Sequence, residues 1–244
     1  MGKKAQPTIV ALLTGRGGST LKNKNVLPIL GKPLLYYPAK AARDSRYIEA
    51  HFVSSDDEKI LKAAEAVGYE RIKRPPALSK PDAQHGDVIR HAVKEMKKRG
   101  TNPDLVVVIL ANSVTTKTQW LDDCIRMMMM DDSLTCVAPA FEDSDHHPHR
   151  AKRLNRDGFF EPFFDFKGKK VSSNRQDLDP SYFFCHTFWV IRASNLDRDV
   201  GHPPWTFMGH RTKPYVMKEA TFDVHERGDV VHSEAWVRAN VKKV

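Results

Sequence analysis

Short apolar runs alternate along the first half of the chain with longer amphipathic segments. The runs at 9–13, 50–54 and 104–110 are rich in β-branched residues and are typical of buried strands. Between them, segments 58–67 and 85–99 place apolar residues at helical spacing. Because strands joined by helical crossovers pair in parallel, the pattern predicts an α/β fold with a doubly wound, mostly parallel sheet. We expect the strongly apolar run at 104–110 in the centre of that sheet.

The second half of the chain continues this pattern and then interrupts it. Further helices are predicted over 119–130 and 229–241, and further strands over 134–140, 182–191 and 213–217. Four consecutive methionines, 127–130, cover all sides of the first of these helices, which favours core filling over a metal site. Between 141 and 181, aromatic, turn-forming and basic residues mix without a period, which indicates an excursion of β-hairpins out of the sheet. We expect a single domain, 1–244, that carries 141–181 as this excursion.

Two connecting segments carry more specific expectations. A helix is expected to start at Gly31-Lys32-Pro33, because proline is favoured in the first turn of a helix. Residues 71–78 are expected to form a loop that consecutive prolines stiffen. Asp56 and Asp57 precede the helix predicted at 58–67, so helix capping is the favoured interpretation and metal binding the alternative.

The loop that follows the first strand combines glycines with positive charge. In Gly15-Arg16-Gly17-Gly18-Ser19, the glycines let backbone N–H groups approach a ligand closely, and successive N–H groups form an anion-binding nest. Lys22 and Lys24 add positive charge nearby. The loop matches neither the Walker A motif, because Pro33 follows Gly31-Lys32, nor the GxGxxG dinucleotide fingerprint. We interpret it as a phosphate-binding site; the alternative is a tight turn with solvated lysines.

The composition limits the classes of partner. The formal net charge of +9 favours anionic ligands, but the basic residues are scattered and do not form a stripe interleaved with aromatics. We therefore expect small polyanions and no nucleic acid. No apolar stretch approaches the roughly 20 residues of a membrane span, and residues 1–7 lack the apolar core of a signal peptide, so no membrane partner is expected. Cys124, Cys136 and Cys185 are far apart and odd in number, which suits reduced thiols in the cytoplasm.

Several short motifs occur in an order that resembles one enzyme family. RGGST, KN and LPILGKPLL near the N-terminus are followed by VSSDD, RPPAL, HHP, RQDL and FDV. This series resembles the sugar-acid cytidylyltransferases, the CMP-sialic acid and CMP-Kdo synthetases, and it covers nearly the whole chain. The resemblance implies a nucleotidyltransferase fold of the GT-A or Rossmann-like kind. It also implies a homodimer in which 141–181 serves as a substrate and dimerisation excursion.

The activity that this resemblance implies is nucleotide transfer to an acidic sugar. CTP and a nonulosonate or a Kdo-like ulosonate would give the CMP-sugar and pyrophosphate. Such a reaction needs the charge of the leaving group neutralised and the attacking hydroxyl aligned. Mg²⁺ would bridge phosphate oxygens and one or two carboxylates, with Mn²⁺ as the alternative ion.

The family's functional residues carry over onto matching positions of this sequence. Expected at the catalytic and triphosphate-binding positions are Arg16, Lys24 and Asp223, with the backbone amides of Gly17, Gly18 and Ser19. Expected along the rest of the nucleotide are Asn25, Arg74, His85 and Asn112. Expected sugar contacts are Arg150, Arg175, Gln176 and His186. Arginine suits the last group because its two-pronged donor geometry matches a carboxylate; a surface salt bridge is the alternative for Arg150 and Arg175.

The expected metal ligands depart from the family pattern. Asp223 is the first choice of carboxylate, but His225 stands where the family has a second aspartate. Because Mg²⁺ binds imidazole poorly, we expect weaker dependence on Mg²⁺, a preference for Mn²⁺, or recruitment of Asp229. Alternatively, His225 only caps the following helix. The cluster His146-His147-Pro148-His149 suggests zinc, but the proline breaks helical spacing and no cysteine lies nearby, which favours a structural or substrate-edge role.

Further departures leave alternatives open. Cys185-His186-Thr187 replaces the family's Asn-Gly-Ala, which predicts an acidic acceptor other than N-acetylneuraminate. Ala111-Asn112 replaces a segment that usually contains glutamine. The alternatives are therefore a nucleotide-binding homologue without turnover and a nucleotidyltransferase that acts on a different anionic acceptor. A nucleic-acid-binding protein is the least favoured alternative.

Overall fold

An eight-stranded sheet forms the centre of the structure, a computed structural model that describes residues 6–18 and 21–241. Its strands are β1 (Ile9–Thr14), β4 (Ala50–Ser55), β5 (Glu70–Lys73), β6 (Leu105–Leu110), β7 (Cys136–Glu142), β10 (Tyr182–Phe184), β11 (Phe188–Arg192) and β12 (Thr212–Val216). Their order is β10-β7-β11-β6-β1-β4-β5, and β12 pairs with β7. Strands β6, β1, β4 and β5 are parallel, whereas β11 runs antiparallel to β6 and β7. The predicted mostly parallel sheet with a central 104–110 strand is confirmed.

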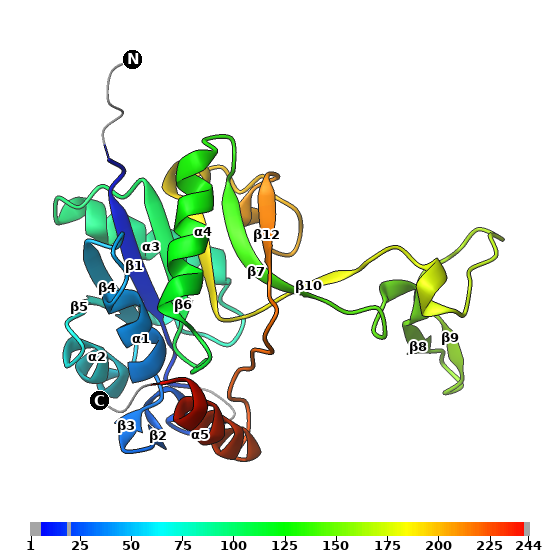
Figure 1. The fold of residues 1–244 in the computed structure, drawn as a ribbon, viewed down its shortest axis with the longest axis horizontal. Coiled ribbons are helices and arrows are strands. Elements are labelled where there is room, and N and C mark those ends of the chain that lie inside the picture. Colours follow the sequence, from blue (N-terminus) through cyan, green and yellow to red (C-terminus); the bar gives the residue numbers. More distant parts are fainter. Residues whose placement is uncertain (1–5, 19–20, 242–244) are drawn as a thin grey trace.

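Helices cover both faces of this sheet (Figure 1). They are α1 (Tyr36–Arg43), α2 (Glu58–Glu65), α3 (His85–Lys98), α4 (Thr118–Met130) and α5 (Gly228–Asn240). Successive side chains of β1 alternate between two core clusters: Leu13 packs with residues of α1, α2 and α4, and Leu12 packs with residues of α3. Because both faces are buried, the strand is a continuous apolar run, as a doubly wound fold requires.

Two predictions about helices need correction. Residues 28–33 do not start a helix, because Leu30 and Gly31 both adopt positive φ, at 46° and 81°. That geometry forms a tight hairpin between β2 (Pro28–Ile29) and β3 (Lys32–Pro33), and α1 follows it. The four methionines fill the core only in part: Met128 is buried, whereas Met130 at the end of α4 is 82% exposed.

The segments on either side of α2 show one corrected and one confirmed prediction. The expected loop at 71–78 begins inside β5, whose Ile72 is fully buried on the parallel partner β4. Asp57 confirms its capping role, since its carboxylate accepts a hydrogen bond of 2.7 Å from the backbone N–H of Lys59 at the start of α2.

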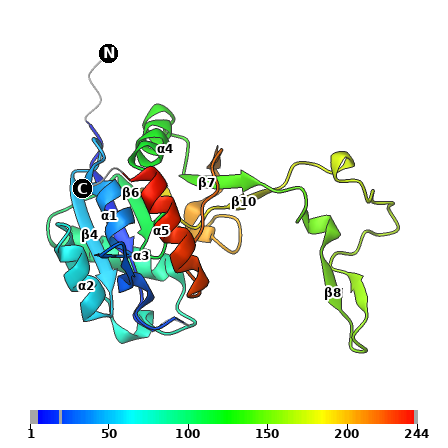
Figure 2. The ribbon, with the colours of Figure 1, turned by 60° about the horizontal axis from the view of Figure 1, so that its bottom comes forward.

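The predicted excursion leaves the sheet as an arm (Figures 1 and 2). Its hairpin joins β8 (Lys152–Leu154) to β9 (Phe160–Pro162), and the chain returns through β10, which pairs with the far end of β7. The expected strand at 182–191 is therefore two strands, β10 and β11, separated by 185–187.

Short 3₁₀ helices complete the described fold. They are η1 (Lys24–Val26), η2 (Pro76–Leu78), η3 (Pro148–Arg150), η4 (Arg175–Asp177), η5 (Ala193–Asn195) and η6 (Thr206–Met208). Among the described residues, no helix has the length and apolar character needed to cross a bilayer.

Candidate functional site

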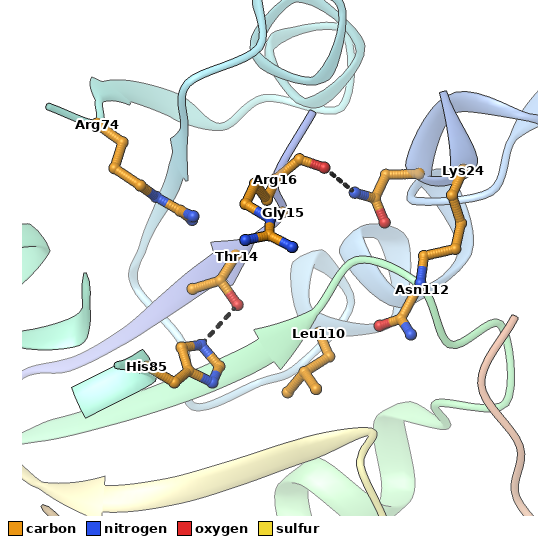
Figure 3. A pocket seen from close by; sticks show the side chains of 9 residues that line it. Thr14, Gly15, Arg16, Lys24, Arg74, His85, Leu110 and Asn112 are labelled. Atoms are coloured by element: carbon orange, nitrogen blue, oxygen red, sulfur yellow. Dashed lines mark hydrogen bonds between the residues drawn. The ribbon is translucent and has the colours of Figure 1, made fainter. Parts of the chain in front are cut away.

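A pocket of about 230 Å³ opens where β1 and β6 end. It is lined by Thr14, Gly15, Arg16, Lys24, Asn25, Arg74, His85, Leu110 and Asn112 (Figure 3). The predicted nucleotide residues Arg16, Lys24, Asn25, Arg74, His85 and Asn112 therefore meet in one place. They come from loops and element starts that are far apart in the sequence, and the carboxyl ends of parallel strands bring them together.

Two residues that line the pocket were not predicted. Thr14 and Leu110 are the last residues of β1 and β6 and lie opposite each other in the parallel ladder. Their positions carried a usable signal, because the final residue of a buried parallel strand faces the ligand crevice of such a sheet. Thr14 is the more informative, since its hydroxyl is a polar group that is only 7% exposed.

The glycine loop approaches the neighbouring acidic segment closely. The Gly17 N–H donates to Asp56 Oδ1 at 3.1 Å, and a Cβ at Gly17 would lie 2.7 Å from Asp57 Oδ2. In this conformation the Gly17 amide is therefore engaged by a carboxylate. A Cβ at Gly18 would meet no other atom within 4 Å. Ser19, the remaining predicted amide, lies outside the described residues.

Two arginines approach the pocket from different supports. Arg16 Nη1 donates to the backbone oxygen of Lys80 at 2.8 Å, and Asn25 Nδ2 donates to the Arg16 carbonyl at 3.2 Å. Arg74 is buried, and its Nη2 donates to the Ser54 carbonyl at 2.7 Å. Burial lowers the pKa of Arg74 to about 10, so the side chain is still a cation at neutral pH. Both guanidinium groups are held by backbone oxygens, which fixes their direction.

Lys24, Asn112 and Asp223 form the opposite side of the site. Burial lowers the pKa of Lys24, against the attraction of Asp223. Burial raises the pKa of Asp223 to about 7, although Lys24 and a hydrogen bond from Asn112 act in the other direction. The Asn112 carbonyl also accepts from the Val224 N–H at 2.9 Å, which ties the segment after β6 to the segment before α5. Asp223 is thus a mostly buried carboxyl group beside a cation.

The two expected metal ligands lie close together. His225 Nε2 is 3.8 Å from Asp223 Oδ2, and its side chain is 70% exposed. The Asp229 carboxylate accepts from the backbone N–H groups of His225 and Glu226 at 2.7 and 2.9 Å, and these bonds lower its pKa. Asp229 is thus engaged at the start of α5. Within the described residues, no group of three or more histidine, cysteine or acidic side chains is arranged to hold a metal ion.

This donor set is nevertheless compatible with Mg²⁺. Mg²⁺ is commonly held by one or two carboxylates together with substrate phosphates and waters. Asp223 supplies one such oxygen donor beside Lys24, and Lys24 and Arg16 are cations that line the adjoining pocket. His225 adds a nitrogen, which Mn²⁺ accepts better than Mg²⁺.

His85 and His186 belong to an aromatic cluster at the other end of the pocket. The His85 ring lies 5.3 Å from Trp189, and the His186 ring lies 5.8 Å from Trp205. Burial, with Arg74 and His186 nearby, lowers the pKa of His85 to about 4. Burial also lowers the pKa of His186. Both imidazoles are therefore neutral at pH 7.

The remaining predicted sugar contacts lie on the arm and do not line the pocket of their own chain. Arg150 Nη1 donates to the Asp145 carbonyl and Arg175 Nη1 to its carboxylate, each at 3.2 Å, and Gln176 is exposed. The arm extends away from the body of the molecule that holds the pocket (Figure 1). In one chain, the structure therefore separates these residues from Arg16, Lys24 and Asp223.

The histidine-rich segment of the arm is organised by local contacts. His147 is buried and its Nδ1 accepts from the His149 N–H at 3.1 Å, while His146 Nδ1 lies 2.7 Å from Asp143 Oδ2. The His147 and His149 rings contact each other edge to face at 4.8 Å. The three cysteines are free and buried.

The chain matches a known family model and is similar in sequence to proteins of known name. A family model described as Cytidylyltransferase matches residues 10–157, more than half of the chain. N-acylneuraminate cytidylyltransferase of Streptococcus agalactiae is 25% identical over 227 residues, which cover 91% of this chain and 52% of that protein. The Oncorhynchus mykiss enzyme of the same name is 30% identical over 82% of this chain and 44% of its own. The chain thus spans about half the length of these relatives.

A shorter relative and two solved structures match over most of their lengths. Pseudaminic acid cytidylyltransferase of Campylobacter jejuni is 25% identical over 74% of this chain and 76% of its own. A CMP:2-keto-3-deoxy-manno-octonic acid synthetase complexed with CTP superposes with a TM-score of 0.68 at 16% identity, over 96% of this chain and 100% of that one. A 4-diphosphocytidyl-2C-methyl-D-erythritol synthase from Anaerococcus prevotii gives 0.63 at 13% identity, over 96% and 97%. Both structures support the expected nucleotidyltransferase fold.

Proposed function

Since the chain belongs to the cytidylyltransferase family, we propose that it transfers CMP from CTP to an acidic sugar, a nonulosonate or a Kdo-like ulosonate. The observation that carries this proposal is that Arg16 and Lys24 line one pocket at the carboxyl ends of β1 and β6, with the Asp223 carboxyl group beside Lys24. Fixed cations beside an ionisable carboxyl group are what a triphosphate and its leaving pyrophosphate require.

The chemical step is a displacement at the α-phosphorus of CTP. A sugar hydroxyl oxygen forms the new P–O bond, the bond to the β-phosphate oxygen breaks, and the hydroxyl proton passes to a base. Arg16 and Lys24 neutralise the charge that develops on the leaving pyrophosphate. When bound, Mg²⁺ would supply further charge neutralisation from Asp223, with His225 beside it.

The acceptor side of the reaction leads us to propose a homodimer. Arg150, Arg175 and Gln176 lie on an arm away from the pocket of their own chain, so they act there only if the arm of another copy delivers them. The arm also exposes large apolar side chains, with Phe159 at 69% and Phe160 at 80%. Exposed aromatic residues in such number support a protein interface.

The test is pyrophosphate release from CTP in the presence of a panel of acidic sugars, with Mg²⁺ or Mn²⁺. We expect release with one nine-carbon or eight-carbon ulosonate. We expect less release with N-acetylneuraminate, because in Cys185-His186-Thr187 the histidine and threonine have larger side chains than the glycine and alanine of the Asn-Gly-Ala that it replaces. CTP binding without release for any acceptor would favour the alternative, a nucleotide-binding homologue without turnover. The observation that favours this alternative is His225, which stands where the family has a second aspartate.

A further inference from the structure

The pocket has two ends of different character. Lys24 and Asn112 lie on one side, and Arg74 and His85 lie on the other (Figure 3). The first side is next to Asp223 and suits phosphates. The second side is backed by the rings of Trp189 and Phe207, which lie 5.3 and 6.4 Å from the His85 ring. A polar edge in front of aromatic rings suits a heterocyclic base.

The hydrogen-bond partner of His85 determines which ring nitrogen carries the proton. Thr14 Oγ1 lies 3.1 Å from His85 Nε2 and donates to the backbone oxygen of Ile109 at 3.3 Å. A hydroxyl has one proton, and a carbonyl can only accept. If Thr14 gave its proton to His85, two oxygens with lone pairs would face each other without a proton between them. The Thr14 proton therefore goes to Ile109, and His85 Nε2 carries the proton that it donates to Thr14.

A neutral imidazole with the proton on Nε2 has a lone pair on Nδ1. The environment of His85 keeps it neutral, because burial and the nearby cation of Arg74 lower its pKa to about 4. Among the described residues, Thr14 is the hydrogen-bond partner of the ring, and Nδ1 has none. In Figure 3 the second ring nitrogen points away from Thr14 toward the side of Leu110, which also lines the pocket.

We propose that His85 Nδ1 accepts a hydrogen bond from the exocyclic amino group of cytosine, and that Thr14 is the positioning residue that fixes this tautomer. The inference rests on the proposed function and deepens it, by assigning the choice of base to these two residues. Arg74, a fixed donor on the same side, complements the carbonyl oxygen and ring nitrogen that cytosine presents as acceptors.

The same arrangement rejects uracil. Uracil carries an oxygen where cytosine carries its amino group, so it would place an acceptor against the Nδ1 lone pair. A tautomer change would relieve this repulsion only by leaving the lone pairs of His85 Nε2 and Thr14 Oγ1 facing each other, or by taking the Thr14 proton away from the Ile109 carbonyl. Either change loses a hydrogen bond in a buried setting, which is costly. Discrimination by one mismatched hydrogen-bonding position is about 10-fold to 100-fold.

The experiment measures the Kd of CTP and of UTP by calorimetry, without an acceptor sugar. We expect the unaltered protein to prefer CTP by at least about 10-fold. In His85→Gln the side-chain amide can present either a donor or an acceptor, so the ratio of the two Kd values should fall toward 1. In Thr14→Val the shape is kept but the acceptor for Nε2 is lost, so the ratio should also fall.

The matched control is His91→Gln, the same exchange on the same helix at a residue that does not line the pocket. It should keep the ratio of the unaltered protein. Thermal melts of all variants show whether the fold is retained. Nitrogen NMR of the histidine-labelled protein should show the proton of His85 on Nε2, and its loss from that nitrogen in part of the molecules of Thr14→Val.

An unchanged ratio in His85→Gln, with CTP still bound, would overturn the assignment of base choice to His85. An unchanged ratio in Thr14→Val alone would overturn the positioning role of Thr14. Failure of the unaltered protein to bind either nucleotide would overturn the proposed function together with this inference. Pyrophosphate release from CTP with an unaltered ratio in both variants would leave the proposed function standing and remove the inference alone.

Discussion

At the residue scale, Arg16 and Lys24 are the groups whose loss should affect turnover most. Arg16→Ala and Lys24→Ala should each lower kcat/KM by about 100-fold or more, because a charge that meets the leaving group is worth several kcal/mol of the barrier. Among the described residues, the Arg16 side chain donates to one backbone oxygen in an exposed setting, so its removal should change the free energy of unfolding by under about 0.5 kcal/mol. The measurements are pyrophosphate-release kinetics and chemical denaturation.

Lys62→Ala supplies the control for this pair. Lys62 is an exposed lysine of α2 outside the pocket, so its removal changes the net charge equally and should leave kcat/KM unchanged. Near-normal turnover in Arg16→Ala or Lys24→Ala would remove that residue from the mechanism.

His85 should make the stability of the protein depend on pH. Its pKa is lowered from 6.5 to about 4 in the folded state, so between these values the unfolded chain binds a proton that the folded protein does not. The free energy of unfolding should therefore fall as the pH drops from 7.5 to 5, with at most about 2 kcal/mol of the loss due to this residue. Denaturation at both pH values, compared with His85→Gln, isolates the effect. An equal pH dependence in both proteins would contradict the neutral state of His85.

His225 decides the metal preference if it acts as a ligand. His225→Asp places an oxygen donor in reach of the position that the imidazole occupies, 3.8 Å from Asp223. Because Mg²⁺ prefers oxygen ligands, the variant should need less Mg²⁺ for half-maximal activity and should lose any preference for Mn²⁺. Metal titrations of CTP turnover check this. Identical titration curves for the variant and the unaltered protein would show that position 225 is not a ligand.

How far the sequence predicted the pocket can be judged from individual residues. Arg16 and Lys24 were identified from the basic glycine loop and from the family resemblance, whereas Arg74 and His85 were identified from the resemblance alone. The sheet topology brings all four together. Thr14 was missed because it continues the apolar run of β1 and has no charge. Its importance follows only from its partners, His85 and Ile109, which lie 71 and 95 positions away in the sequence.

At the element scale, the Asp57 side chain caps the start of α2. Asp57 accepts from the Lys59 N–H at 2.7 Å, so Asp57→Ala should lower the free energy of unfolding by about 1 kcal/mol. Asp57→Asn keeps an acceptor oxygen at the cap and should recover most of that loss. Thermal melts of the two variants check the expectation. Equal melting temperatures for Asp57→Ala and the unaltered protein would show that the cap is not needed.

Local sequence predicted the long elements better than the short ones. The runs behind β1, β6 and α3 are long enough for their period to identify them, and all three formed where expected. The β2–β3 hairpin has only two residues in each strand, and its turn uses Leu30 at positive φ, a conformation that leucine rarely adopts. Gly31 suits its own position in the turn, but Leu30 does not, so the turn depends on tertiary context: Ile29 and Leu34 are buried in the cluster that also contains Val237 of α5.

At the scale of the whole molecule, the arm separates the two groups of predicted substrate contacts. Its aperiodic sequence indicated hairpins, and β8 and β9 form one. Its direction was not predictable, because an arm that makes few contacts with its own sheet is not placed by the hydrophobic pattern of that sheet. The separation of Arg175 from the pocket is therefore a property of the tertiary structure. Arg175 can contact the sugar only if the arm of another copy reaches this pocket.

The proposed homodimer predicts complementation between two inactive variants. Arg175→Ala should abolish acceptor use through the arm, and Arg16→Ala should abolish catalysis in the pocket. If the arm of one subunit serves the pocket of the other, a mixed dimer has one site that carries both substitutions and one site that carries neither. Random mixing makes about half of the dimers mixed, so the mixture should regain about a quarter of the unaltered activity. The variants are mixed after dissociation and assayed for pyrophosphate release, with Arg16→Ala mixed with itself as the control. If the arm served the pocket of its own chain, every site in the mixture would carry one of the two substitutions and none would be intact. A mixture no more active than its components would therefore refute the exchange of arms.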